Sequence, residues 1–156
     1  VDALKLEGGK EIADTIKHLV DIGIPVMGHL GLTPQSVHKF GGYGVRAKET
    51  AEAEKLITDA VALDEAGCFA ITLEKVPADL AAEVTKRVSC ATIGIGAGHV
   101  TDGQILVYAD MLGLTQGFKP KFLRQYAHLA QQMNDAVQAY ITDVKAATFP
   151  SVDESY

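Results

Sequence analysis

The sequence has few cysteines and no long apolar run, and each absence excludes a class of protein. Cys68 and Cys90 are its only cysteines and lie far apart, so neither a CxxC redox pair nor a zinc knuckle is available. We expect both to be buried as small apolar side chains in a reducing cytosol. No apolar stretch approaches the roughly 20 residues that span a bilayer, and no signal peptide is apparent. These absences predict a cytoplasmic protein that does not enter a membrane.

Clustered positive charge is also lacking. The chain has 14 Lys and Arg against 20 Asp and Glu, a net charge of -6, and no stretch gathers the cations that phosphate neutralisation requires. We therefore expect no nucleic-acid partner. The chain does have an ordinary globular composition, 47% apolar and 22% charged over 156 residues, which is sufficient for a folded domain with a buried core.

Short apolar runs alternate with longer stretches of helical period, which is typical of βα units in a parallel sheet. The apolar runs predict five strands, at residues 2–7, 24–29, 68–74, 91–96 and 104–108. Apolar residues spaced three and four apart predict helices between them. We expect Gly23 and Gly67 to follow two helix ends and Pro77 to open a third helix.

The C-terminal region predicts one long helix, from about Lys121 to Ala147. Its apolar stripe, which we interpret as core or as a subunit interface, comprises Phe122, Tyr126, Leu129, Met133, Val137, Tyr140 and Val144.

Five βα units leave open sheet edges, and a complete barrel needs eight units in about 250 residues. We therefore predict that residues 1–156 form a single domain of the α/β class. This domain is the C-terminal part of a (β/α)8 TIM barrel and covers about its last five βα units, so the N-terminal strands lie outside this chain.

Polar residues at the ends of the predicted strands indicate a site, because parallel barrels place their chemistry at the carboxyl ends of strands. Strand alternation puts Lys5 and Glu7 on one side and the neighbouring leucines on the other. Glu7 offers the hard oxygen that Mg²⁺ prefers, and Lys5 offers a cation for a carboxylate or a developing enolate. The alternative is a simple Lys–Glu ion pair at the rim.

Two further strands end in polar side chains. His29 ends the second strand, where a hydrogen-bonded structural histidine is the alternative to a functional one. Glu74 ends the third and is predicted to point inward as a general base. In the fourth strand, alternation predicts Thr92, Gly94 and Gly96 on the inner side, where small residues leave room for a ligand. A phosphate-binding barrel stays possible, although the glycine pattern is a weak signal.

The order and spacing of several motifs resemble those of the ketopantoate hydroxymethyltransferase family, nearly from end to end. The motifs are KLEGG (5–9), GHLGLTPQ (28–35), FGGY (40–43), LEKVP (73–77), IGIGAG (93–98), TDGQ (101–104), KPKF (119–122) and FP (149–150). The resemblance implies an enzyme that transfers a hydroxymethyl group from 5,10-methylenetetrahydrofolate to 3-methyl-2-oxobutanoate. The product is 2-dehydropantoate, in pantothenate and coenzyme A biosynthesis.

The resemblance also implies roles for four residues. Glu74 matches the base that abstracts a proton, Lys5 the lysine that binds the keto acid, and Glu7 a glutamate associated with Mg²⁺ through a bridging water. His29 matches a family histidine to which we assign hydrogen bonding in the substrate pocket. The family forms homo-oligomers, often decamers. Its other metal-binding residues sit on earlier strands, so we expect no turnover by this chain alone.

Lys75, which follows the base, departs from the small or apolar residue expected there, and we expect this to matter little. The glycine-rich loop, residues 40–46, is either a lid that closes over the folate or a plain surface loop. Two other functions remain open: a Mg²⁺-dependent phosphoenolpyruvate/pyruvate-type barrel that forms or cleaves C–C bonds without folate, and a non-catalytic fragment.

Overall fold

The computed structural model describes residues 1–117 and 119–156, which divide into two compact units: unit 1, Val1–Ile105, and unit 2, Leu106–Tyr156. A five-stranded sheet forms the centre of unit 1. Its strands are β1 (Leu4–Glu7), β2 (Val26–Gly31), β3 (Ala70–Glu74), β4 (Ala91–Ile95) and β5 (Gly103–Gln104). All neighbouring pairs are parallel, in the order β1-β2-β3-β4-β5. The prediction of a parallel α/β sheet is therefore confirmed.

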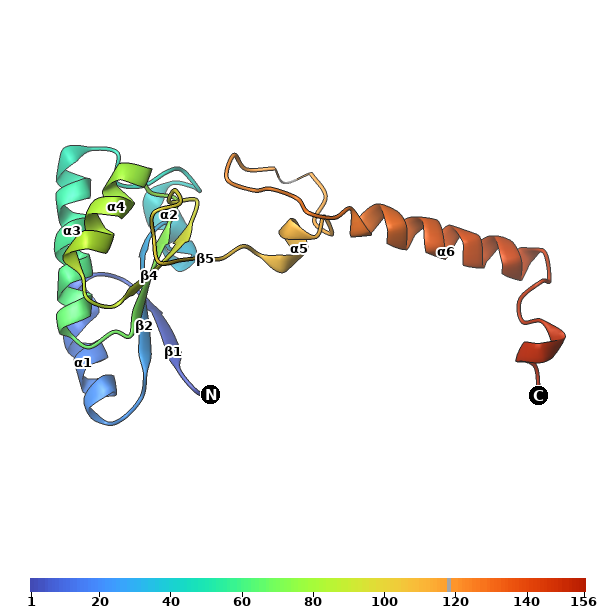
Figure 1. Cartoon of the computed structure of the whole chain (residues 1–156), viewed down its shortest axis with the longest axis horizontal. Helices are drawn as coiled ribbons and strands as arrows, with labels where there is room; N and C mark the ends of the chain where they lie inside the picture. The colour runs from blue at the N-terminus through green and yellow to red at the C-terminus, as the bar shows by residue number, and fades with distance from the viewer. Residues whose placement is uncertain (118) are drawn as a thin grey trace. The chain divides into compact units, whose positions relative to one another are not determined.

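Three helices, α1 (Ala13–Asp21), α3 (Thr50–Glu65) and α4 (Ala78–Arg87), cover one face of this sheet (Figure 1). Because crossovers between parallel strands are right-handed, a strand order without reversal keeps its helices on one face. A doubly wound sheet reverses its order and carries helices on both faces. The arrangement is therefore consistent with part of a TIM barrel. Barrel closure, the number of units and the assignment of residues 1–156 to one domain stay predictions.

The core of unit 1 lies between the sheet and these helices. Ile71 and Leu73 of β3 are fully buried there, against Ile16 of α1, Leu63 of α3 and Val84 of α4. Complete burial of one such side chain contributes about 2 kcal/mol to folding. The predicted helix ends are confirmed, because Gly23 and Gly67 follow α1 and α3 in the left-handed conformation and Pro77 is the N-cap of α4.

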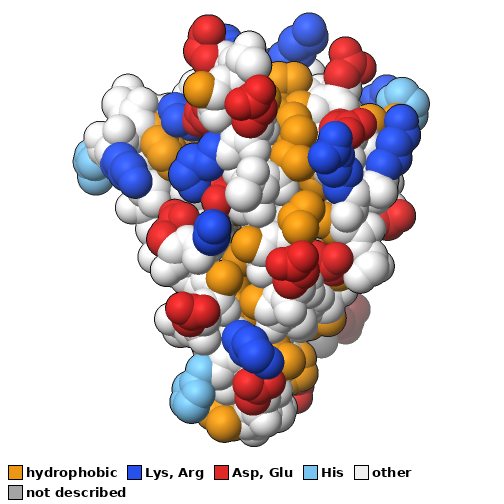
Figure 2. Space-filling view, turned by 90° about the vertical axis from the view of Figure 1, so that its left-hand side faces the viewer, with side chains coloured by type: hydrophobic (Ala, Val, Ile, Leu, Met, Phe, Trp, Pro, Cys, Tyr) orange, Lys and Arg blue, Asp and Glu red, His pale blue; other side chains and the backbone are white. Residues whose placement is uncertain are grey.

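The outer face of the helical layer carries both signs of charge (Figure 2). Short ion pairs one helical turn apart lie on it, Lys17 with Asp21 at 3.1 Å and Arg87 with Glu83 at 2.7 Å. Such exposed pairs contribute little to stability. This layer supports the sheet, and the polar strand ends that concern function lie on the sheet's other face.

The fifth predicted strand is wrong beyond Gln104. The last ladder bond runs from the Ile105 N–H to the Gly94 carbonyl, at 3.0 Å. The chain then enters the short helix α5 (Tyr108–Met111), where the Tyr108 carbonyl accepts the Leu112 N–H at 2.9 Å. The segment between β4 and β5 contains no helix.

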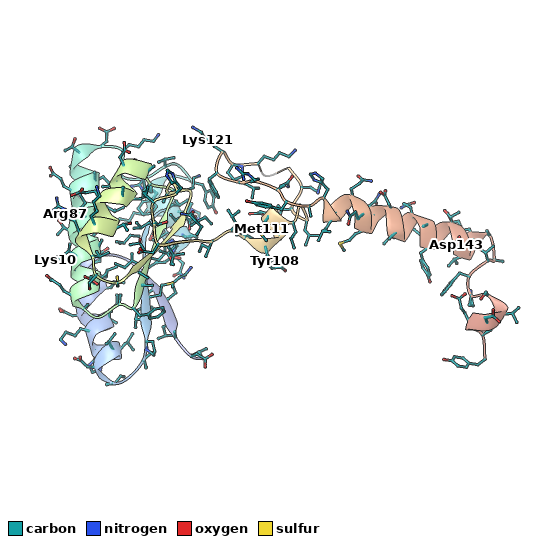
Figure 3. The ribbon with its side chains drawn as sticks, in the orientation of Figure 1. Lys10, Arg87, Tyr108, Met111, Lys121 and Asp143 are labelled. Carbon is teal, nitrogen blue, oxygen red and sulfur yellow. The ribbon has the colours of Figure 1, made fainter. Side chains whose placement is uncertain are left out.

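Unit 2 contains α5, α6 (Leu129–Lys145) and the turn η3 (Val152–Glu154). The predicted helix start at Lys121 is wrong, because the Tyr126 N–H bonds to the carbonyl of Met111, at 2.8 Å, instead of the one four residues earlier. At the C-terminal end of α6, the Asp143 carbonyl accepts the Thr148 N–H at 3.0 Å. Met111 and Asp143 are labelled in Figure 3. Across the described residues, no helix combines the length and apolar character that crossing a membrane requires.

Candidate active site

The candidate site is centred on His29, toward the carboxyl end of β2. The register pairs Glu7 of β1 with His29 of β2, and Glu74 of β3 with Gly31 two residues further on. Alternation therefore places all three polar side chains on the face opposite the helices. His29 is 1% exposed, whereas the carboxylates of Glu7 and Glu74 stay in partial contact with solvent, at 14% and 19%. The structure thus brings these three predicted residues together.

A carboxylate lies beside each nitrogen of the imidazole. The His29 Nδ1 is 3.8 Å from a Glu7 oxygen, and its Nε2 is 3.2 Å from a Glu74 oxygen. Neither ring nitrogen makes a well-aligned hydrogen bond to any described residue. A buried polar group without a hydrogen-bond partner lowers the stability of the folded state. Such a position is suited to a ligand or an ordered water that completes the hydrogen bonds.

Glu7 is held by the turn that follows β2. Its second carboxylate oxygen accepts the Gln35 N–H at 3.0 Å, and the next residue, Gly8, donates its N–H to the His29 carbonyl at 3.3 Å. Gln35 belongs to the short helix η2 (Pro34–Ser36), with Thr33 as the N-cap residue and Pro34 in its first turn. This short helix therefore fixes the position of the Glu7 carboxylate from one side.

The backbone of Glu74 is clamped by its neighbours. Its carbonyl accepts the Leu32 N–H at 2.8 Å, and the following Lys75 N–H bonds to the Ile95 carbonyl at 2.9 Å. Gly31 allows this approach, since a Cβ there would lie 2.2 Å from the Glu74 carbonyl oxygen and the residue has φ +88°. Only glycine fits that combination. The sequence signal is the second glycine of the GHLGL motif, which we did not single out.

Lys5 lies on the same sheet face but apart from the cluster. It pairs in register with Met27, two residues before the Glu7–His29 pair. Its side chain is exposed, and it makes no hydrogen bond or ion pair to the described residues. The alternative of a Lys5–Glu7 ion pair is therefore not what the structure contains. Lys5 instead offers a cation to whatever approaches this face.

The inner residues of β4 were predicted wrongly. Glu74 pairs with Ile95, and Thr72 with Ile93, so the isoleucines share the site's face. Thr92 and Gly94 point toward the helices instead, and the Thr92 hydroxyl lies 2.9 Å from that of Thr85 in α4. Gly96, which has φ +64°, already lies beyond the strand. The room that we expected from small side chains is therefore filled by apolar ones.

Thr72 is a site residue that the sequence analysis missed. It is 1% exposed and pairs in register with His29, while its hydroxyl donates to the Met27 sulfur at 3.4 Å. A thioether is a weak acceptor, so this hydroxyl is available to a better one. The signal was present, because alternation counted back from Glu74 reaches Thr72.

A cavity of about 130 Å³ lies beside the cluster. Its walls come from Gly8 and Gly9, the end of β2, residues of α3 between Glu52 and Asp59, and the segment from η2 to the glycine-rich loop. Asp59 of α3 forms one wall and accepts the Lys10 N–H at 3.1 Å. A Cβ at Gly9 would lie 2.1 Å from the Asp59 carboxyl carbon. The turn after Glu7 therefore packs directly on α3.

The residues present fit part of a magnesium site. Glu7 provides a hard carboxylate oxygen of the kind Mg²⁺ binds. No group of three His, Cys, Asp or Glu side chains with metal-binding geometry occurs in residues 1–117 and 119–156. The described chain thus offers fewer than three such side chains to any one metal ion.

The two cysteines take no part in this cluster. Both are free thiols, Cys68 buried and Cys90 half-buried. Burial raises the pKa of Cys68 to about 11 and, together with the nearby Asp64 carboxylate, raises that of Cys90 to about 12. Because the thiolate is the reactive form, neither is suited to nucleophilic chemistry at neutral pH.

Two comparisons with known proteins give matches along nearly the whole chain. The family model described as ketopantoate hydroxymethyltransferase matches residues 1–152. Curated relatives named 3-methyl-2-oxobutanoate hydroxymethyltransferase are 61% identical in Prosthecochloris aestuarii, 59% in Bacteroides thetaiotaomicron and 57% in Porphyromonas gingivalis. Each alignment covers 99% of this chain but only 56% or 57% of the relative. The chain therefore spans about half the length of these relatives.

Proposed function

Since the chain belongs to the ketopantoate hydroxymethyltransferase family, we propose that it provides half of the active site of an enzyme that hydroxymethylates 3-methyl-2-oxobutanoate. The one-carbon donor in this proposal is 5,10-methylenetetrahydrofolate, and the product is 2-dehydropantoate. The observation that carries the proposal is the placement of His29 between Glu7 and Glu74, at neighbouring strand ends of a parallel sheet.

Glu74 is the proposed catalytic base. Its carboxylate accepts the proton from the carbon next to the keto group, and the electron pair of that C–H bond forms the enolate. The enolate carbon then attacks the methylene carbon of the folate as one C–N bond breaks, and the folate nitrogen released takes up the proton held by Glu74. Water then cleaves the second C–N bond: its hydroxyl goes to the methylene carbon and its proton to the other folate nitrogen, which leaves tetrahydrofolate. Partial exposure leaves the Glu74 carboxylate accessible to substrate, while its clamped backbone fixes where the proton is taken. Positioned bases of this kind contribute about 10²- to 10⁴-fold to rate.

The neighbouring residues bind and orient in this proposal. Lys5 is the unpaired cation of this face among the described residues, and it binds the carboxylate of the keto acid. His29 hydrogen-bonds in the pocket and keeps Glu7 and Glu74 apart, because its ring lies between them. Glu7 would help to hold Mg²⁺, through a water. When bound, Mg²⁺ supplies Lewis-acid polarisation of the keto acid, which lowers the barrier to proton loss.

The chain alone is proposed to be inactive, because the remaining metal-binding groups of the proposed site lie outside it. The described residues hold no three-ligand cluster. A homo-oligomer, which the family resemblance implies, stays a prediction.

The test joins this chain to the N-terminal portion of a curated relative and follows two reactions in the hybrid. With Mg²⁺ and the keto acid alone, we expect deuterium to exchange into the carbon next to the keto group. Product is expected only when 5,10-methylenetetrahydrofolate is added. Glu74→Gln keeps the shape of the side chain but removes the base, so both reactions are expected to fall about 10³-fold.

Glu65→Gln in α3 is the matched control, because Glu65 is an exposed glutamate on the helical side. It is expected to leave both rates unchanged. Product formation without folate would favour the folate-independent C–C bond-forming barrel. Full activity of this chain without the N-terminal portion would show that the half-site proposal is wrong, and an active Glu74→Gln hybrid would remove Glu74 from the role of base.

A further inference from the structure

Lys75, the residue after the proposed base, has an unusual backbone. Its φ is +48°, in the left-handed region that residues other than glycine seldom adopt. Both backbone groups are nevertheless bonded: the N–H to Ile95, as above, and the carbonyl to the Arg46 N–H at 2.8 Å. Such strain persists where the surrounding structure holds it in place. The chain leaving Glu74 is therefore joined to β4 on one side and to the glycine-rich loop on the other.

The Lys75 side chain makes a second connection to the same loop. Its ammonium group donates a hydrogen bond to the Tyr43 carbonyl, across 32 positions of sequence. Hydrogen bonds from a charged donor are stronger than neutral ones. Lys75, which we expected to matter little, thus holds the tip of the loop with its side chain and the base of the loop with its backbone.

The loop has few other attachments. A Cβ at Gly41, Gly42 or Gly44 would meet nothing within 4 Å, and the Tyr43 side chain is 65% exposed. The loop closes on itself where the Arg46 guanidinium lies 4.0 Å over the Phe40 ring, and Arg46 also pairs with Glu52 of α3. For residues 43–45, the bond from Lys75 is the only hydrogen bond to another element within the described chain.

We propose that Lys75 is a positioning residue that couples the glycine-rich loop to the strand end bearing Glu74. The inference rests on the proposed function and assigns the loop to its second step, addition to the folate. Glu74 is held through backbone bonds in which the Lys75 side chain takes no part. Loss of the ammonium group therefore releases the loop tip without moving the base, so proton abstraction continues while addition to the folate slows.

The experiment compares Lys75→Met with wild type in the same hybrid enzyme. Methionine keeps a long flexible stem and removes only the donor. Amide hydrogen exchange of residues 43–46 is expected to rise about 5-fold, as for loss of one hydrogen bond. Folate-dependent product formation is expected to fall about 5-fold in kcat, whereas folate-free deuterium exchange into the keto acid stays within about 2-fold. Lys75→Arg, which restores a charged donor, is expected to recover both.

Lys48→Met is the matched control, since Lys48 is an exposed lysine just beyond the loop with no ion pair among the described residues. It should change neither measurement. Unchanged amide exchange of residues 43–46 in Lys75→Met would show that Lys75 does not hold the loop. Equal losses of rate in both reactions would show that Lys75 acts through Glu74 or through the fold. If even wild type fails to exchange the keto-acid proton, the proposed function falls, while amide exchange of the loop still decides the role of Lys75.

Discussion

The two long helices α3 and α6 show how differently the two units use similar sequence patterns. They contain 16 and 17 residues, and both carry apolar residues at helical spacing. α3 buries Leu56, Ala60 and Leu63 against the sheet of unit 1, whereas α6 buries no residue at all. On α6, Met133, Val137 and Tyr140 are 54–60% exposed. An amphipathic period thus tells which face of a helix is apolar, but not which surface covers that face.

The proposed chemistry and the proposed assembly also belong to different units. Every residue of the candidate site belongs to unit 1, where the core fixes the strands that carry them. Unit 2 contributes an apolar stripe outside any core of the described residues. A large exposed apolar surface is typical of an interaction site. We therefore expect unit 1 to govern stability and catalysis, and unit 2 to govern association.

The largest effect is expected from truncating matched apolar side chains in the two helices. Leu63→Ala removes a side chain that is 0% exposed, so it should lower the free energy of unfolding by about 3 kcal/mol. Val137→Ala removes one that is 54% exposed and should change it by less than about 0.5 kcal/mol. Urea unfolding of the chain, followed by circular dichroism, measures both. Equal losses of unfolding free energy from the two substitutions would mean that the apolar stripe of α6 is packed in solution, as the apolar face of α3 is.

A charge placed on the stripe should weaken association of copies while unit 1 stays folded. Val137→Asp puts a carboxylate where an apolar interface is proposed and is expected to raise the dissociation constant of the oligomer about 10-fold. Gln138→Asp adds the same charge on a neighbouring, non-apolar position and serves as the control. Sedimentation of the hybrid enzyme compares the two. An oligomer that tolerates Val137→Asp as well as Gln138→Asp is not held together by this stripe.

Much of unit 1 followed from local patterns. The first four strands lie where apolar runs predicted them, and the glycines after α1 and α3 ended those helices as expected. The errors lie where the backbone finds non-local partners. The N–H of Tyr126 bonds to Met111, fifteen positions earlier, and no period in the sequence reveals such a competitor for the helical bond. The chain after Gln104 likewise leaves the sheet although its apolar residues favour a strand.

The site was predictable in part, for a physical reason. Within one strand, alternation tells which side chains share a sheet face once the face of one residue is known. This assignment was correct for Lys5 with Glu7 and for Glu74. Across strands the register is needed, and the sequence does not contain it. The faces of Thr92 and Ile93 were therefore exchanged, and the contact of Gly31 with the Glu74 carbonyl went unnoticed. Family resemblance selected residues, but only the register placed them on one face.

The smallest effect concerns acid stability, which should again depend on unit 1. Burial tends to raise the pKa of Asp64, but hydrogen bonds from the N–H groups of Ser89 and Cys90 outweigh it and lower that pKa below 3.8. A lowered folded-state pKa adds stability above the unfolded value, and this stability is lost as pH falls through the folded one. Asp64→Asn should therefore cost about 1 kcal/mol near pH 6, after allowance for solvent screening, and progressively less below pH 3.8.

In unit 2, hydrogen bonds from Ser151 lower the pKa of the exposed Glu154, yet Glu154→Gln should leave unfolding of unit 1 unchanged. Hydrogen exchange of β3 amides across this pH range measures both, and a pH-independent cost of Asp64→Asn would contradict the assignment.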